Sequence, residues 1–236
     1  MLHLPCKKIG IVVFSFFFAM SLHAQIGGKE NYNFRDFNRK SYYFGINVGF
    51  NSSGYKLRQS GFFINNDSIK VTEGKSEIGV NMHMITNLKL GEYFDFRFLP
   101  GFSFAQRGFE YTSVLDSKVT ERKIESVFFE LPFHIRFKSE PYKDKRLFVV
   151  AGLKYSYDVQ TNSKSRKSLI KVAPHDFQYE VGVGMQMFYP YFIFSPEIKF
   201  SRGLGNILIY DPSRNEARIL ENVVSQIFTI SFNFEG

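Results

Sequence analysis

Apolar and polar side chains alternate along most of the chain that follows residue 40. The clearest case is Phe94 to Phe104, where five phenylalanines share one parity and mostly charged or small residues occupy the other. Successive side chains of a β-strand point to opposite faces, so this segment predicts a strand with one aromatic and one polar face. The apolar face recurs too often for one small core to absorb it, which indicates that lipid covers it.

Seven further segments alternate in the same way. The eight predicted strands cover residues 42–50, 77–90, 94–111, 123–138, 147–160, 176–188, 192–201 and 224–234. The predicted connections are short at 91–93, 139–145 and 189–191, and longer and polar at 51–76, 112–122, 161–173 and 206–223. Each segment has about the 9 to 11 residues that a tilted strand needs to cross a bilayer. Short turns at one end, long loops at the other and an even strand number are typical of a bacterial outer-membrane barrel with both termini in the periplasm.

The sequence therefore predicts an all-β fold, an eight-stranded antiparallel up-and-down transmembrane β-barrel over residues 41–236. The alternative is a soluble lipocalin-like barrel, whose apolar face would point inward. An eight-stranded barrel has an interior only just wide enough for side chains or one small ligand. The large apolar side chains of a sequence with 29 Phe and 13 Tyr do not fit there, whereas the face rich in Gly, Ser and Asn does.

The N-terminus has the pattern of an export signal. In residues 1–24, Lys7 and Lys8 precede an apolar run that ends in a suitable cleavage site at Ala24, which predicts a signal peptide. A membrane anchor is the alternative, but the run is shorter than the ~20 residues of a spanning helix. Removal of the signal would also remove Cys6, the one cysteine, so the mature chain could not use disulfides or thiolate chemistry.

Residues 25–40 are polar with a few aromatic side chains, and they predict a periplasmic N-terminal lead-in. Two interpretations remain open: a loosely ordered tail, which termini commonly form, or a segment that docks on a partner. No second long apolar run follows the signal, which argues against a helical membrane protein.

Composition and motifs exclude several kinds of function. The net charge of +8 could favour nucleic acid or anionic lipid, but the Lys and Arg residues are scattered and no nucleic-acid recognition motif is present. The sequence has no cluster with metal-ligand spacing, no nucleophile elbow and no phosphate-binding loop. His175 and Asp176 are adjacent, so on a strand they point to opposite faces and cannot act as a hydrolase pair. We expect no enzymatic activity, no cofactor, no nucleic-acid partner and no small-molecule substrate.

The polar parity of the strands carries charges that would face the lumen. The seven that we select as a lumen charge network are Arg97, Glu130, Arg136, Lys154, Glu180, Glu197 and Lys199. Charges in a narrow lumen must be paired or hydrated, because an unpaired buried ion is costly.

Simple hairpin register predicts the partners of these charges. It places Glu130 opposite Lys154, Lys89 opposite Asp95, and Glu180 opposite Glu197, which would need a cation from a neighbouring strand. We favour a network that fills the barrel as a rigid plug. The alternative is that Glu180 and Glu197 form a general acid/base pair or a proton-responsive gate.

Several strand motifs, taken together, resemble the PorT family of Bacteroidetes-type outer-membrane proteins. They are Tyr43-Phe44-Gly45-Ile46-Asn47-Val48-Gly49, Leu99-Pro100-Gly101-Phe102-Ser103-Phe104-Ala105-Gln106-Arg107, Ile124-Glu125-Ser126 with Glu130-Leu131-Pro132, Ala151-Gly152-Leu153-Lys154-Tyr155, Tyr179-Glu180-Val181-Gly182-Val183-Gly184 and Ser195-Pro196-Glu197-Ile198-Lys199-Phe200-Ser201-Arg202-Gly203-Leu204.

This resemblance implies an outer-membrane location and a part in the type IX secretion system, which exports folded proteins bearing a C-terminal signal and serves gliding motility in some species. It implies other type IX components and outer-membrane lipid as partners, and no catalytic residues. The alternatives are a stand-alone small barrel for adhesion, envelope stability or narrow solute passage, and a lipid-modifying enzyme, for which no catalytic cluster is visible in the sequence.

Overall fold

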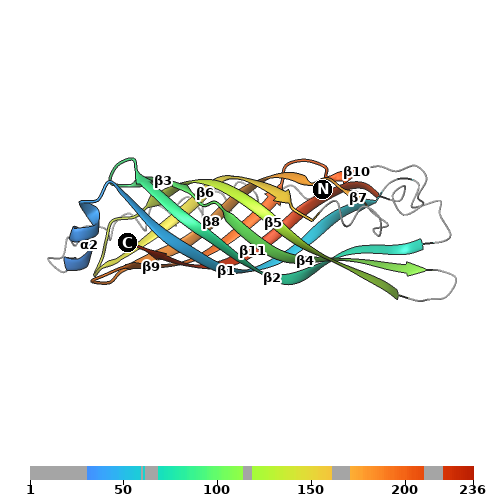
Figure 1. Ribbon diagram of the computed structural model, residues 1–236, viewed down its shortest axis with the longest axis horizontal. Coiled ribbons are helices and arrows are strands. Elements are labelled where there is room, and N and C mark those ends of the chain that lie inside the picture. Colours follow the sequence, from blue (N-terminus) through green and yellow to red (C-terminus); the bar gives the residue numbers. More distant parts are fainter. Residues whose placement is uncertain (1–30, 60, 62–68, 114–118, 161–170, 210–219) are drawn as a thin grey trace, which may run out of the picture.

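The structure, a computed structural model, describes residues 31–59, 61, 69–113, 119–160, 171–209 and 220–236 (Figure 1). The predicted signal peptide at 1–24 lies outside them. The strands are β1 (Tyr42–Gln59), β2 (Ile69–Lys89), β3 (Phe94–Phe98), β4 (Gly101–Ser113), β5 (Val119–Lys138), β6 (Lys145–Asp158), β7 (Lys171–Val172), β8 (His175–Phe188), β9 (Ile193–Gly203), β10 (Leu208–Ile209) and β11 (Leu220–Glu235).

The long strands close into a barrel in which every described pairing is antiparallel. β1 pairs with both β2 and β11, and the ring continues through β9, β8, β6 and β5. β2 and β5 each pair with both β3 and β4. These two segments are therefore parts of one barrel strand that is interrupted at Leu99 and Pro100. The ring therefore has eight barrel strands, and the predicted up-and-down barrel is confirmed.

The apolar parity faces outward, as the alternation predicts. Phe94, Phe102 and Phe104 are about half exposed, whereas Asp95 and Arg97 on the other parity are fully buried. Outward rings pack against one another across neighbouring strands, as in the Phe98–Phe133 stack with centroids 4.7 Å apart. Such cross-strand aromatic pairs add to the stability of the wall.

The longest predicted loop, 51–76, is partly strand. β1 continues to Gln59 and β2 begins at Ile69, so much of the predicted 51–76 connection is paired backbone. The 21 residues of β2 span about 70 Å at ~3.3 Å per residue, which exceeds the ~30 Å hydrocarbon core even with a ~45° tilt. The part of a strand that extends beyond the lipid need not have an apolar face. The sequence of this part therefore has the polar pattern that predicts a loop.

The end of the barrel that carries the short turns is covered by a helix, α2 (Tyr32–Asn38) (Figure 1). Phe37 is buried there against Phe188 and Ile193. The helix is also anchored to the β5–β6 turn, where the backbone N–H of Phe34 donates to Asp144 Oδ1 at 3.0 Å. The interpretation of 25–40 as a loose tail is therefore wrong for this helical part, because aromatic side chains bury themselves at the barrel mouth.

No helix in the described ranges is long and apolar enough to cross a membrane.

Glycines let some strands approach closely, and Gly152 in β6 gives a test. A Cβ at this position would lie 2.0 Å from Phe133 O and 2.7 Å from His134 Cδ2. Gly152→Ala should therefore destabilise the barrel by about 1 to 3 kcal/mol, as overpacking does. The free energy of unfolding in lipid vesicles, measured by urea titration, checks this.

Gly91→Ala is the matched control for Gly152→Ala. A Cβ at Gly91 would have nothing within 4 Å, and no described glycine has a positive φ. Equal stabilities for the two variants would contradict the close approach at Gly152.

Candidate functional site

The lumen is filled by polar and charged side chains of the inward parity. Among the residues whose burial is described, the buried cations are Arg97, Arg107, Arg136, Lys138, Arg146, Lys154 and Lys199, and the buried carboxylates are Asp95, Glu130, Asp176, Glu180, Glu197 and Glu235. These seven cations and six carboxylates nearly balance. All seven residues of the predicted lumen charge network are in this set, each no more than 4% exposed.

One group of charges lies toward the end that α2 covers. Glu235 Oε1 accepts hydrogen bonds from Arg97 Nη2 at 2.7 Å and from Arg136 Nη2 at 3.0 Å, so the last residue of β11 joins β3 to β5. Asp95 accepts from the ammonium of Lys138 and from the hydroxyl of Tyr43. Two cations that donate to one carboxylate form strong, charge-assisted hydrogen bonds. These bonds tie together strands that lie far apart in the sequence.

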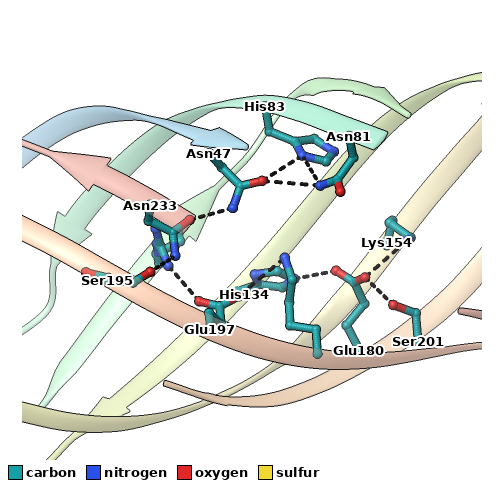
Figure 2. Close-up of polar contacts among 12 residues, drawn as sticks. Asn47, Asn81, His83, His134, Lys154, Glu180, Ser195, Glu197, Ser201 and Asn233 are labelled. Carbon is teal, nitrogen blue, oxygen red and sulfur yellow. Dashed lines mark hydrogen bonds and ion pairs between the residues drawn. The ribbon is translucent and has the colours of Figure 1, made fainter. Parts of the chain in front are cut away.

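A second group lies around Lys154. Its Nζ is 3.4 Å from Glu130 Oε1 and 3.1 Å from Glu180 Oε1. Each carboxylate also contacts a histidine. His83 Nε2 is 3.1 Å from Glu130, and His134 Nε2 is 2.6 Å from Glu180, a contact drawn in Figure 2. One cation therefore serves two carboxylates, and each carboxylate gains a second polar partner, as a buried charge requires.

Glu197 extends the first group of charges to Lys199. Its Oε2 is 3.3 Å from Arg97 Nη1, and its Oε1 is 3.3 Å from Lys199 Nζ. Because Arg97 also binds Glu235, the ion pairs run without a break from Lys199 to the end of β11.

A chain of asparagines runs across four neighbouring strands on the lumen side, beside these charges (Figure 2). Asn47 donates to Asn233 Oδ1 at 2.5 Å and accepts from Asn81 Nδ2 at 3.3 Å. Asn233 in turn donates to the backbone carbonyl of Ser195 at 2.8 Å. The chain links β2, β1, β11 and β9 with neutral groups, so these strands are held without further charge.

Apolar clusters close both ends of the lumen. One is the cluster of Phe37, Phe188 and Ile193 under α2. At the opposite end Tyr55 and Val223 pack with Ile207. This residue lies directly before β10, one of the two strands of the small β7–β10 sheet.

The cavity in the described part of the lumen, between the two apolar clusters, is small. A cavity of about 10 Å³ remains among Asn51, His83 and Lys199. That is about the least volume that holds one water, so this lumen is packed and not an open channel.

The predicted hairpin registers were partly wrong. Lys89 does lie opposite Asp95 in the ladder. Its Nζ donates to the backbone carbonyl of Phe37 instead of forming an ion pair with Asp95. Lys154 lies opposite Pro132, two residues from the predicted Glu130, although its long side chain still reaches that carboxylate.

The predicted pair of facing carboxylates is also wrong. Glu180 lies opposite Ser201 and Glu197 lies opposite Gly184, a register displaced by four residues. The acid/base or gating hypothesis loses its geometric basis, since each carboxylate has its own cation.

Several lumen residues were not selected from the sequence. Glu235 shares the parity of Asn233 and Ser231, so the alternation alone could have identified it. His83 and His134 were not part of the selected network, but they contact Glu130 and Glu180. Arg107 is sandwiched between Tyr55 and Phe128, with ring centroids 4.8 and 4.4 Å from its Cζ, a cation–π arrangement that no local pattern signals.

The chemistry that this arrangement supports is structural. Within the described part of the chain, no group of three or more His, Cys, Asp and Glu residues is placed to hold a metal ion. His134 Nε2 and the Ser201 hydroxyl both contact Glu180, so the carboxylate serves as a hub of the packed network.

Removal of Lys154 tests the network. Lys154→Met leaves Glu130 and Glu180 without their shared cation, and breaking a buried pair in this way costs about 3 to 5 kcal/mol. The free energy of unfolding by urea titration in lipid vesicles should fall by that amount.

Arg58→Met is the matched control for Lys154→Met. It removes an ion pair with Glu221 whose side chains are 76% and 58% exposed, and exposed positions change stability by about 0.5 kcal/mol or less. A loss no larger for Lys154→Met than for Arg58→Met would contradict the buried network.

The packed lumen also predicts the electrical behaviour of the barrel. Purified protein in a planar bilayer should give no discrete conductance steps, because the remaining cavity of about 10 Å³ cannot hold a continuous file of water. Regular steps from the folded barrel would show that the lumen opens.

Solved structures of small outer-membrane proteins are similar to the chain, at low sequence identity. OprG from Pseudomonas aeruginosa has a TM-score of 0.48 and 11% identity, covering 83% of this chain and 95% of that one. Neisserial surface protein A has a TM-score of 0.43 and 8% identity, covering 80% and 95%.

The attachment invasion locus protein Ail of Yersinia pestis, solved with the heparin analogue sucrose octasulfate, has a TM-score of 0.40 and 10% identity, covering 84% of this chain and 100% of that one. No curated protein matches the sequence. The family model described as "Outer membrane protein beta-barrel domain" matches residues 24–208, which is more than half of the chain. The chain therefore belongs to this family of outer-membrane β-barrel proteins.

Proposed function

We propose that this barrel is a non-enzymatic component of the type IX protein secretion system, needed for export of proteins with a C-terminal secretion signal, and for gliding motility in species that glide. The resemblance of its strand motifs to the PorT family supports the assignment to this system. The proposal places both chain termini in the periplasm, as is usual for barrels of this kind.

The packed lumen is the observation that carries the proposed role. A lumen with balanced ion pairs, apolar clusters at both ends and a cavity of about 10 Å³ does not conduct a folded protein. The translocation pore would then be another subunit, and this barrel would act through its outer surfaces.

The α2 end of the barrel offers a surface suited to such contacts. Tyr32 is 73% exposed and Tyr191 is 91% exposed, and Arg35 on the helix and Arg39 directly after it are also exposed. Tyr and Arg are enriched in protein interfaces, because they combine apolar area with hydrogen bonding. A docked helix holds this surface in one orientation against the turns.

A stand-alone binding or adhesion barrel is the second candidate. The observation that favours it is the continuation of β2, β4 and β5 as paired strands beyond the length that lipid covers, seen at the right of Figure 1. A projecting sheet presents a large surface outside the membrane.

Deletion of the gene tests the two candidates. In a clean deletion, proteins with a C-terminal secretion signal should remain in the cell and be lost from the culture medium, measured by immunoblot of both fractions. Restoration by the wild-type gene is the control. Normal export in the deletion strain would exclude the secretion role and leave the adhesion barrel.

Complementation with α2 variants tests whether the helix surface matters. Phe37→Ala removes the side chain that packs against Phe188 and Ile193, so the helix should undock while the barrel still folds. Phe177→Ala, at an exposed outward position of β8 far from the α2 end, is the control for the loss of one aromatic ring. Export should fall with Phe37→Ala far more than with Phe177→Ala, and equal export would contradict a contact role for the docked helix.

A further inference from the structure

The outer wall of the barrel has a hollow near its α2 end. It has a volume of about 590 Å³ and lies across β6, β8 and β9, with Leu147, Val149, Val183, Met185 and Ile198 on its walls. These side chains belong to the outward, lipid-facing parity, and four of them are described as at least 46% exposed: Leu147, Val149, Val183 and Ile198. The volume falls within the ~300 to 1,000 Å³ of small-molecule sites.

The hollow lies where the pairing of β8 with β9 is interrupted. Gly184 of β8 is on the inward parity, and a Cβ there would lie 2.3 Å from Phe148 Cζ, so the buried ring of Phe148 lies beneath the strand at this level and lines the hollow. On the neighbouring strand Pro196 has no N–H to donate to the ladder. The pairing of β8 with β9 passes from Gly184–Glu197 to Met187–Phe194 with no pair between these described residues.

The end of the hollow nearest the turns carries a cation. Lys145 is exposed and begins β6, two residues before Leu147 on the same outward face, which places it about 7 Å along the strand. Lys143 in the same turn is also exposed. The acidic groups of this turn are engaged elsewhere: Glu140 accepts from the Tyr93 hydroxyl, and Asp144 accepts from Asn33 and the Phe34 backbone of α2.

We propose that this hollow is a binding site for one anionic phospholipid, with an acyl chain along the hollow and the phosphate at Lys145. The walls are apolar and lie in the membrane-facing surface, where the available occupant is a lipid. An ammonium at the interfacial end complements a phosphate, and Lys side chains near a membrane surface attract anionic lipid. The site is independent of the secretion role, because it follows from the wall and not from a partner subunit.

Native mass spectrometry of the folded barrel in detergent tests the site. The protein is titrated with phosphatidylglycerol and, separately, with phosphatidylcholine of the same acyl chains. We expect retention of one phosphatidylglycerol molecule per barrel at concentrations where phosphatidylcholine is not retained. Val183→Phe fills the hollow and should weaken retention about tenfold or more, which corresponds to ~1.4 kcal/mol.

Val80→Phe is the matched control for the hollow, since Val80 is an exposed outward residue of β2 and is not among the residues that line it. Lys145→Gln should remove the preference for phosphatidylglycerol, whereas Lys56→Gln at an exposed position of β1 should not. Faster gel migration before heating than after it verifies that each variant is folded.

Three outcomes would overturn the proposal. Equal retention by Val183→Phe and Val80→Phe would mean that lipid does not occupy the hollow. Retention of several lipids without a preferred number would mean ordinary annular lipid. A preference for phosphatidylglycerol that survives Lys145→Gln would place the phosphate elsewhere.

Discussion

Neutralisation of buried charge without bulk water is the constraint on which this barrel depends. Eight strands enclose an interior that side chains fill, so each inward Arg, Lys, Asp or Glu needs a counter-charge or another polar or aromatic partner within the protein. Glu235 accepts from two arginines, and Lys154 lies between two carboxylates. Because these contacts cross strands, the charges that are costly to bury also specify which strands lie near one another.

The apolar and polar parts of the molecule are inverted relative to a soluble barrel, and each part has a separate task. The outward phenylalanines face the lipid and pack across strands, as Phe98 and Phe133 do. The inward charges and asparagines occupy the lumen, and the clusters around Phe37 and Tyr55 close its ends. A polar interior sealed at both ends keeps the ion pairs away from competing water, which strengthens them.

A sealed interior moves the functional question to the surfaces. Three differ in their chemistry: the docked α2 end with its exposed tyrosines and arginines, the projecting sheet of β2, β4 and β5, and the lipid-facing wall with the hollow at Gly184. The first suits a protein partner, the second a ligand outside the membrane, and the third a lipid. Each surface thus has one proposed kind of partner, and the three surfaces can be tested separately.

The sequence by itself determined the faces of the strands, because side-chain alternation is a local property with a period of two. It identified the barrel and the buried position of all seven selected charges, including Arg97 and Glu197. It did not determine their partners. A slip of two residues preserves every face, so alternation cannot distinguish the predicted Lys154–Glu130 register from the observed Lys154–Pro132 register. Only the closed barrel decides which charges meet and where α2 docks, since both depend on contacts between residues far apart in the chain.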